Sequence, residues 1–480
     1  MAKEKSTNKI LLTSLFFVSS VIFLVIFSWS TSPLFKFAGY DSCVFKAMGS
    51  FMADGLTPYK DFFDHKGPVV VFVEWIGYGL AKNDYTLFLL QAIFLTAALL
   101  GVYKIAKLFL NNKKSIWLTI LTLPICSFFM SGQHGNTVEE WILPLLIWSS
   151  YFSVKFFAYK QKEHDFKAAI LYGVTVAFAA FSRATNAIPI LIIILVILIY
   201  LIKQKEWKNI LKNIVAFIVG ALIVTIPIFI WFGVNGAFKE MMHATFIFNY
   251  EYIKHRAFVS DTGRILRHTA RYLLPLIFAI VLQIAMIAKK KDVWLNVALI
   301  IQSVVAVVMQ LSSPLFPHYL TIWVPTIVVT LILVVKDYGV MKLFVRGYVT
   351  LLILVFIGTN FISFKRYNDY LSSNFKLSSA SCKDIGKHIP DKNKNVLSIG
   401  LNPYIYLSTN TKPCFRLFHS QDAFSSYDKE IENEWNKDIA SMKADYIILR
   451  NSRRYPYLTF LQKNYKLIYK NNKLSLLEKK

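Results

Sequence analysis

Four residues with reactive side chains lie in one stretch near the N-terminus, GYDSCVFKAMGSFMADGLTPYKDFFDHKGP, residues 39–68. Asp41 stands near its beginning, and Asp64, His65 and Lys66 follow one another near its end. A carboxylate can act as a general base towards a hydroxyl group, and a cation or a hydrogen-bond donor can stabilise a leaving phosphate. The stretch is therefore suited to transfer of a group from a phosphate to a hydroxyl. Asp41 would be the base, Lys66 would contact the phosphate, and His65 would orient either partner.

Each of these residues also has a purely structural interpretation. Asp41 could cap a helix over residues 42–53, whose apolar residues have helical spacing. Lys66 could pair with Asp64 and extend its stem along an apolar surface. His65 could be an ordinary hydrogen-bonding residue. The sequence leaves these alternatives open.

The composition places this stretch in a membrane protein. Of the 480 residues, 55% are hydrophobic and 17% are charged, whereas ordinary soluble proteins have about 25% charged residues. These values exclude a soluble enzyme and a disordered chain. The formal charge of +26 could suit nucleic acid, but the lysines gather in short loops between apolar runs, so we expect no nucleic-acid partner. Four cysteines without a CxxC pair predict neither a disulfide scaffold nor a zinc site.

About eleven apolar runs are long enough to span a bilayer as helices. The lysine-rich loops between them all fall on one side if the short run 68–81 is not a span. The positive-inside rule then places the N-terminus in the cytoplasm and the C-terminus outside. Residues 68–81 are expected to form a helix at the outer interface. The runs lie near residues 10–30, 85–103, 115–131, 141–158, 168–183, 186–202, 213–233, 272–288, 293–311, 319–335 and 343–362.

The predicted fold is an all-α polytopic membrane protein with a small C-terminal α/β domain. Residues 1–362 would form the transmembrane part, with a long first outer loop at 31–84. Residues 363–480 are more polar, and they alternate a helix-like segment at 379–389 with strand-like segments at 395–400 and 445–450. Cys382 and Cys414 lie in this tail and could pair in an oxidising compartment.

The remaining outer loops carry further candidates. Glu139 and Glu140 could bind sugar hydroxyls, hold a cation together with His134, or pair with Arg183. Arg183 lies between two apolar runs, where it could hold a phosphate through two hydrogen bonds or reach lipid headgroups. The loop at 312–318 ends at His318, which could touch substrate, as could Tyr319 unless it anchors a helix at the interface. A basic stretch in the loop 234–271 could grip a lipid phosphate or contact anionic headgroups; it contains Lys254, His255, Arg256, Arg264, Arg267 and Arg271.

The order of these features resembles integral-membrane glycosyltransferases of the GT-C type. An acidic residue follows the first span, then come an amphipathic helix, the motif DFFDHKGP and an interfacial helix. The sequence is most similar to the bacterial branch related to protein O-mannosyltransferases and the aminoarabinose transferase of lipid A. The resemblance covers about residues 10–340 and is most specific over residues 40–75. Many members have two adjacent acids after the first span, whereas here Ser42 follows Asp41.

The resemblance implies a donor sugar linked to a polyprenyl phosphate and an acidic catalytic residue in the first outer loop, which corresponds to Asp41. It implies a bacterial plasma-membrane enzyme whose acceptor is a surface glycan, a lipid or a protein. We expect no cofactor and no required metal, although a divalent ion is compatible with the acidic residues. Residues predicted to bind the phosphate or the sugar of the donor are Asp64, His65, Lys66, Glu139, Glu140, Arg183, Arg267, Arg271, His318 and Tyr319.

Two other functions are known for membrane proteins with many spans, namely transport of a lipid-linked sugar and ligation or polymerisation of O-antigen. A lipid-linked sugar transporter or flippase would need polar residues at the membrane midplane, and the predicted spans have almost no charges at their centres. An O-antigen ligase or polymerase usually has its main outer loop late in the chain, and here the loop with reactive residues comes first.

Overall fold

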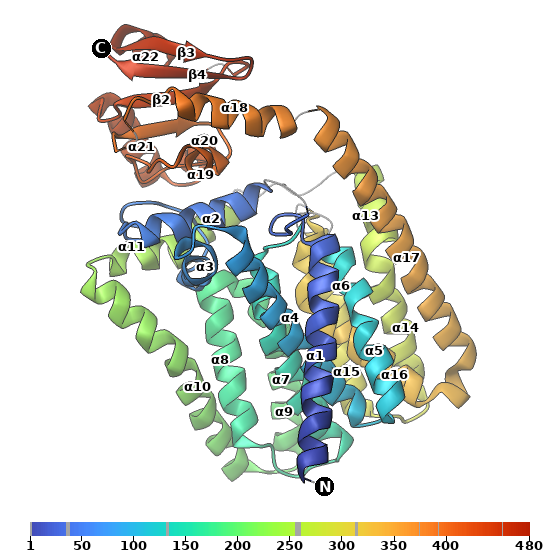
Figure 1. The fold of residues 1–480 in the computed structure, drawn as a ribbon. Coiled ribbons are helices and arrows are strands. Elements are labelled where there is room, and N and C mark those ends of the chain that lie inside the picture. The colour runs from blue at the N-terminus through green and yellow to red at the C-terminus, as the bar shows by residue number, and fades with distance from the viewer. Residues whose placement is uncertain are drawn as a thin grey trace. The chain divides into compact units, whose positions relative to one another are not determined.

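In a computed structural model, shown in Figure 1, the chain divides into two compact units. The structure describes residues 2–34, 39–130, 134–254, 261–312, 315–373, 375–391, 393–453 and 455–480. We call the first unit the helical unit; it comprises Met1–Lys36, Phe88–Ile228 and Ala257–Phe364. The second, the mixed unit, comprises Phe37–Leu87, Phe229–Arg256 and Lys365–Lys480.

Within the described residues, the helical unit contains all or most of thirteen helices. Several of them begin where a side chain accepts a hydrogen bond from a backbone N–H that has no partner in the first turn. Asn111, Asp165 and Asp261 cap α5, α8 and α13 in this way. The helices are α1 (Ala2–Phe27), α4 (Asp84–Lys107), α5 (Asn112–Ile120), α6 (Thr122–Met130), α7 (Val138–Ala158), α8 (Phe166–Arg183), α9 (Ile188–Lys203), α10 (Trp207–Val234), α13 (Thr262–His268), α14 (Leu274–Ala288), α15 (Val293–Leu311), α16 (Val324–Lys336) and α17 (Tyr338–Ser373).

In the described chain, eight helical segments are long and apolar enough to cross a membrane. Three differences separate this number from the predicted eleven. The predicted span at 115–131 is divided between two shorter helices, and the one at 343–362 is matched only by the shorter apolar segment Arg346–Phe361. Phe166–Lys203 combines two predicted spans, α8 and α9, which the 3₁₀ turn η2 (Ala184–Ala187) separates. The other seven are Lys9–Phe27, Asp84–Lys107, Val138–Ala158, Trp207–Val234, Thr262–Ala288, Val293–Leu311 and Pro317–Lys336. The prediction of a mostly helical membrane protein is confirmed.

The predicted span at 115–131 is wrong as a single helix. The chain breaks at Leu121, which leaves α5 and α6 with nine residues each. Pro124 explains the break, because its ring would clash with the carbonyl group of Ile120, four residues earlier, in a continuous helix. The predicted span at 343–362 lies within α17.

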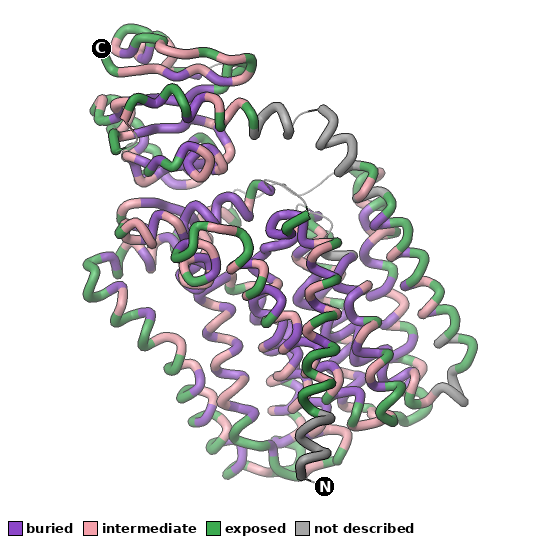
Figure 2. Tube along the Cα trace, in the orientation of Figure 1, coloured by how far each residue is buried: buried purple, intermediate pink, exposed green. Residues whose placement is uncertain are grey.

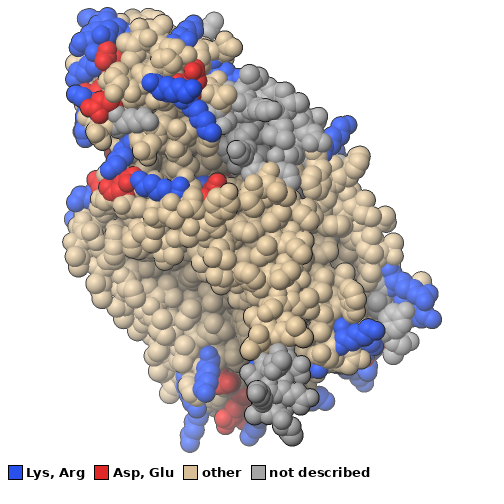
Figure 3. All heavy atoms as spheres, in the orientation of Figure 1, with Lys and Arg blue, Asp and Glu red and all other residues tan. Residues whose placement is uncertain are grey.

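Burial in the helical unit differs strongly between helices. In the most apolar window of Pro317–Lys336, 89% of the residues are buried, against 17% in that of Trp207–Val234. The segment ending in α16 therefore lies inside the bundle, whereas Trp207–Val234 is more apolar, with a mean hydropathy of 2.7 against 2.0, and still mostly exposed, as a membrane helix that contacts lipid can be. Figure 2 colours the buried residues purple. Figure 3 shows charged side chains near the N-terminal end of this unit and a broad uncharged surface beyond it. The uncharged surface suits contact with lipid.

The mixed unit combines short helices with a four-stranded sheet in the order β1-β2-β4-β3. β1 (Val396–Ile399) and β2 (Tyr446–Arg450) are parallel, whereas β4 (Leu474–Lys479) is antiparallel to both β2 and β3 (Tyr465–Lys470). The predicted α/β tail is confirmed. The helices are α2 (Tyr40–Ala53), α3 (Pro68–Glu74), the π turns η1 (Trp75–Gly79) and η3 (His243–Ile247), α11 (Phe238–Met242), α12 (Phe248–Lys254), α18 (Phe375–Lys387), α19 (Tyr404–Thr409), α20 (Gln421–Tyr427), α21 (Lys429–Ser441) and α22 (Leu458–Asn464).

An aromatic core joins the first outer loop to the C-terminal residues within the mixed unit. The ring of Phe51 in α2 packs edge-on against Phe62, Tyr406 and Phe418, with centroids 5.3–5.7 Å apart. Edge-to-face pairs of this kind add to the stabilisation that comes from burial. The loop and the tail therefore share one core, while the predicted domain boundary between residues 362 and 363 stays a prediction.

The two cysteines of the tail are free thiols in this structure. Cys382 lies in α18 and Cys414 precedes Phe415 in the segment before α20, and both are partly buried. The disulfide that the sequence left open is thus not formed here.

Candidate functional site

Asp41 lies in the first turn of α2, where its side chain is partly exposed. Gly39 occupies the N-cap position of this helix, so the interpretation of Asp41 as the capping residue is wrong. In the part of the chain that the structure describes, the Asp41 carboxylate forms no hydrogen bond and no ion pair. A negative charge in a first helical turn is favoured by the helix dipole, so a carboxylate suits this position.

Two glycines fix the position of α2 against the segment that follows the motif. A Cβ atom built on Gly79 would lie 2.1 Å from the carbonyl oxygen of Gly49, and one built on Gly49 would lie 2.5 Å from that of Glu74. Only residues without a side chain allow two backbones to approach so closely. The predicted helix at 68–81, which is α3 and η1, thus acts as the support of α2; it is shorter than a span, as predicted.

The motif DFFDHKGP places Asp64 in the interior of the mixed unit, where it is 3% exposed. Its Oδ1 accepts a hydrogen bond of 2.7 Å from the backbone N–H of Lys66. Its Oδ2 lies 3.1 Å from Nε2 of His419. A buried carboxylate is costly unless it is paired, and these contacts supply the pairing.

His65 and Lys66 continue this buried charge centre. Lys66 Nζ lies 2.8 Å from His65 Nε2, and His65 Nδ1 lies 3.0 Å from Oδ1 of Asn249. Asn249 also donates to the backbone carbonyl of His65. In a neutral ring, Nδ1–H therefore donates to Asn249 and Nε2 accepts from the ammonium group. The backbone N–H of Lys66 contacts Asp64, whereas its Nζ contacts His65. The ion pair between the Lys66 and Asp64 side chains that the sequence allows is not formed among the described residues.

The charges at this centre shift one another's pKa values. Burial and the neighbouring ammonium group of Lys66 lower the pKa of His65 to about 4. Burial alone would raise the pKa of Asp64, but Lys66, His419 and His65 outweigh it and hold that pKa well below its usual range. At neutral pH the centre thus contains the Asp64 carboxylate and the neutral imidazole of His65, whose Nε2 faces Nζ of Lys66.

Tyr40 connects Asp41 with this centre. Its hydroxyl group lies 2.8 Å from Oγ of Ser420, and its ring centroid lies 6.1 Å from that of His419. Burial raises the pKa of Tyr40, and the charges of Asp64 and Asp41 add to the rise against the hydrogen bond with Ser420. Both carboxylates are therefore close enough to Tyr40 to act on it.

The helical unit contains a second group of candidates, centred on Arg183. Its Nη1 donates to Oε1 of Glu139 at 2.6 Å, and its guanidinium carbon lies 3.4 Å from the ring centroid of Tyr319. Arg183 ends α8 with an extended backbone, and Tyr319 belongs to the 3₁₀ turn η5 (Pro317–Trp323). Of the roles considered for Glu139, pairing with Arg183 is the one that the structure shows.

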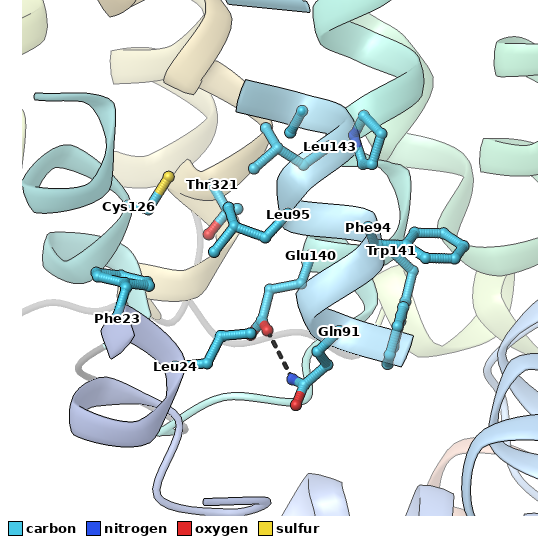
Figure 4. A pocket seen from close by; sticks show the side chains of 12 residues that line it. Phe23, Leu24, Gln91, Phe94, Leu95, Cys126, Glu140, Trp141, Leu143 and Thr321 are labelled. Carbon is cyan, nitrogen blue, oxygen red and sulfur yellow. Dashed lines mark hydrogen bonds between the residues drawn. The ribbon is translucent and has the colours of Figure 1, made fainter. Parts of the chain in front are cut away.

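Glu140 completes the start of α7. Its Oε1 accepts from the backbone N–H and the hydroxyl group of Thr137, which is a capping box, and its Oε2 accepts from Gln91. Figure 4 shows the hydrogen bond between Glu140 and Gln91 at a pocket whose other lining residues are mostly apolar. These contacts give Glu140 a structural role, while its predicted part in donor binding stays a prediction.

The other predicted residues of the helical unit have different environments. Arg267 is exposed at the end of α13, and Arg271 donates to the backbone carbonyl of Thr359 at 3.2 Å. His318 is 5% exposed. His134 stacks on Trp29 with centroids 4.2 Å apart. His255 and Arg256 lie outside the described residues.

No group of three or more His, Cys, Asp or Glu side chains suited to a metal ion occurs in the described ranges. The expectation that the protein needs no metal stays a prediction.

Sequence reasoning missed four residues of these centres: His419, Asn249, Tyr40 and Gln91. His419 and Asn249 are far in sequence from the motif that they contact, and neither belongs to a recognisable motif. Tyr40 directly precedes Asp41, and the start of a predicted helix is a signal that would have included it.

Comparisons with known proteins agree with this architecture. A family model described as the N-terminal domain of the putative competence-induced protein Ccs4 matches residues 3–362. No curated protein matches the sequence.

Three solved structures are similar in fold over most of the chain. ArnT from Cupriavidus metallidurans in the apo state has a TM-score of 0.57 and 12% identity, covering 99% of this chain and 98% of that one. The same protein bound to undecaprenyl phosphate has a TM-score of 0.55 and 11% identity, covering 98% of each chain. An oligosaccharyltransferase from Archaeoglobus fulgidus tethered with an acceptor peptide has a TM-score of 0.53 and 11% identity, covering 94% of this chain and 70% of that one. The predicted GT-C fold is confirmed.

Proposed function

We propose that this chain, which belongs to the family of the putative competence-induced protein Ccs4 N-terminal domain, is a membrane glycosyltransferase that uses a polyprenyl-phosphate sugar. The fold alone allows other activities, so the proposal depends on the site. The observation that carries it is the contrast between Asp41, a carboxylate without a partner in the described chain, and the adjacent centre, whose charges are paired. A free carboxylate beside fixed cations is what a base-assisted transfer from phosphate needs.

In the proposed reaction, Asp41 removes the proton from the acceptor hydroxyl group. The acceptor oxygen then attacks the anomeric carbon, and the bond from that carbon to the phosphate oxygen breaks. The polyprenyl phosphate leaves with the bonding electron pair. The ammonium group of Lys66 stabilises the charge of this phosphate, and His65 holds Lys66 in place. Asp64 and His419 act as positioning residues, because they fix the backbone on which both side chains stand.

Further donor contacts are proposed in the helical unit. Arg183 and Tyr319 form a planar, positively charged surface that suits a phosphate or a sugar ring. Glu139 fixes Arg183, and Arg267, Arg271 and His318 stay proposed donor contacts. ArnT, which has a similar fold, binds undecaprenyl phosphate, and this supports a polyprenyl phosphate as the carrier. The acceptor class is a surface glycan, a lipid or a protein on the outer face.

The test is incubation of the purified chain with a panel of polyprenyl-phosphate sugars, followed by detection of the released polyprenyl phosphate. Asp41→Asn keeps the shape of the side chain and removes its basicity, so we expect transfer to fall by about 10²–10⁴-fold. Asp422→Asn is a control at another helix start, because Asp422 is also the second residue of its helix, α20, and its side chain is half-exposed; unlike Asp41, it pairs with Arg453. It should transfer sugar at the rate of the unchanged chain.

Two outcomes contradict the proposal. Full activity of Asp41→Asn removes Asp41 as the base. Movement of a lipid-linked sugar across proteoliposomes without any transfer, for every donor in the panel, replaces the transferase with a transporter.

A further inference from the structure

A large groove opens on the mixed unit, away from the charge centre of the motif. Its volume is about 950 Å³, which is in the range of sites that hold molecules of several rings. One wall of the groove is formed by the C-terminal half of α2 and the turn that follows it, residues 50–61. The other wall is formed by residues 393–395, by residues 406–416 and by the C-terminal half of α21.

The lining of this groove is rich in hydroxyl and amide groups. Such groups can donate and accept hydrogen bonds at the same time, as sugar hydroxyls also do. A groove of this composition is therefore matched to a carbohydrate chain better than to a lipid tail. The residues are Ser50, Asn393, Asn395, Asn410, Thr411 and Ser441.

Basic residues outnumber acidic ones along the same groove. Six are basic, namely Lys60, Lys82, Lys394, Lys412, Arg416 and Lys443, and four are acidic, namely Asp54, Asp61, Glu434 and Asp438. Lys82 pairs with Asp54 and Arg416 pairs with Glu434. Lys60 and Lys394 are exposed and form no salt bridge or side-chain hydrogen bond within the described part of the chain. These two ammonium groups are available to an anionic ligand.

Hydrogen bonds connect the two walls of the groove. Arg416 donates to the backbone carbonyl of Tyr59 at 3.1 Å, and Lys412 donates to that of Asp54 at 3.2 Å. The backbone N–H of Phe63 also donates to the carbonyl group of Arg416 at 2.8 Å. A groove whose walls are already fixed loses little entropy when it binds a ligand.

We propose that this groove binds an anionic segment of a glycan, with Lys60 and Lys394 contacting its acidic groups and the hydroxyl and amide groups contacting its sugar rings. Its role as the site that holds the acceptor rests on the proposed function, whereas glycan binding itself does not. The acceptor class is thereby narrowed from any glycan, lipid or protein to a negatively charged glycan.

The test measures binding to the full chain in detergent micelles at 0.15 M salt, without any donor. The probe is hexagalacturonate, and the neutral control is maltohexaose, which has the same length and the same type of linkage. We expect the probe to bind and the control to bind at least about tenfold more weakly, because the free ammonium groups have no counterpart in a neutral chain.

Charge-reversal variants locate the binding. Lys60→Glu/Lys394→Glu should weaken the binding of hexagalacturonate by about tenfold or more. Lys383→Glu/Lys463→Glu changes the net charge equally at exposed positions outside the groove, and it should change the affinity by less than about twofold because charges beyond a Debye length are screened.

The proposal is overturned if hexagalacturonate does not bind, if maltohexaose binds equally well, or if both double variants have the same effect. A chain that binds the probe in the groove but transfers no sugar contradicts the proposed function and leaves the groove assignment intact.

Discussion

Replacing Gly79 with alanine tests whether the backbone contact between α2 and η1 positions the catalytic carboxylate. The added Cβ would lie 2.1 Å from the carbonyl oxygen of Gly49, and an ordinary contact is at least 3.4 Å. Neither atom is the end of a flexible side chain, so α2 and η1 must move apart by about 1 Å. Asp41 lies in the first turn of the same helix and moves with it.

The effect of Gly79→Ala on the free energy of unfolding can be bounded. Overpacking in a well-packed interior costs about 1–3 kcal/mol. Alanine in place of glycine in a helical turn returns up to about 1 kcal/mol. The net loss in the free energy of unfolding thus lies between about 0 and 3 kcal/mol, with a central value of about 1.5 kcal/mol. That central value lowers Tm by about 3–6 °C in a unit of this size. Because a misplacement of about 1 Å can reduce a rate by about 10²-fold, we expect transfer to fall more than stability suggests.

The assay combines Tm, followed by intrinsic tryptophan fluorescence in detergent, with the rate of release of polyprenyl phosphate. Gly233→Ala in α10 is the matched control, because its Cβ would have no atom within 4 Å. That variant should retain the full rate and lose no stability. A Gly79→Ala protein with unchanged Tm and unchanged rate would refute the reasoning that this close approach holds α2 in place.

Two further predictions concern the buried charges. The pKa of His65 is about 4 in the folded state and about 6.5 in the unfolded chain, so the unfolded state takes up a proton first as pH falls. At about 1.4 kcal/mol per pH unit, the free energy of unfolding should drop by up to about 3 kcal/mol between pH 6.5 and 4. Denaturant unfolding of the His65→Gln variant should not show this pH-dependent drop in the free energy of unfolding. The same pH profile in the variant and the unchanged chain would contradict the assignment of the drop to His65. Arg183→Leu should cost about 3–5 kcal/mol because it leaves Glu139 buried and unpaired. The double variant Arg183→Leu/Glu139→Leu should recover most of that loss, and failure to recover would show that the pair is not the cause.

The position of the membrane helices follows from local sequence. A run of apolar residues must leave water wherever it occurs, and its backbone must satisfy its own hydrogen bonds in lipid. For this reason α1, α4 and α10 lie close to where the sequence places them. The break before Pro124 was not predicted, and proline alone would not have located it, because α7 and α10 continue through Pro144 and Pro227. The strands β1 and β2 follow from short β-branched and aliphatic runs in a polar tail.

The sequence did not predict which residue caps the start of α2. The sequence predicts a helix in this region, but capping by Asp41 or by Gly39 depends on a shift of two residues. That shift decides whether the Asp41 carboxylate accepts hydrogen bonds from the backbone N–H groups at the start of the helix or is available to contact a substrate.

The sequence by itself determined the kind of protein, the segments in the membrane and the motif in which reactive residues gather. Only the tertiary structure decided their partners: His419 beside Asp64, Asn249 on His65, and Glu139 on Arg183. Hydrophobicity depends on neighbours in the chain, and a pattern can therefore reveal it. A buried charge instead depends on whichever group packing brings to it, and His65 and Asn249 are separated by 184 residues. No spacing rule connects residues so distant, because their contact is a result of the whole fold.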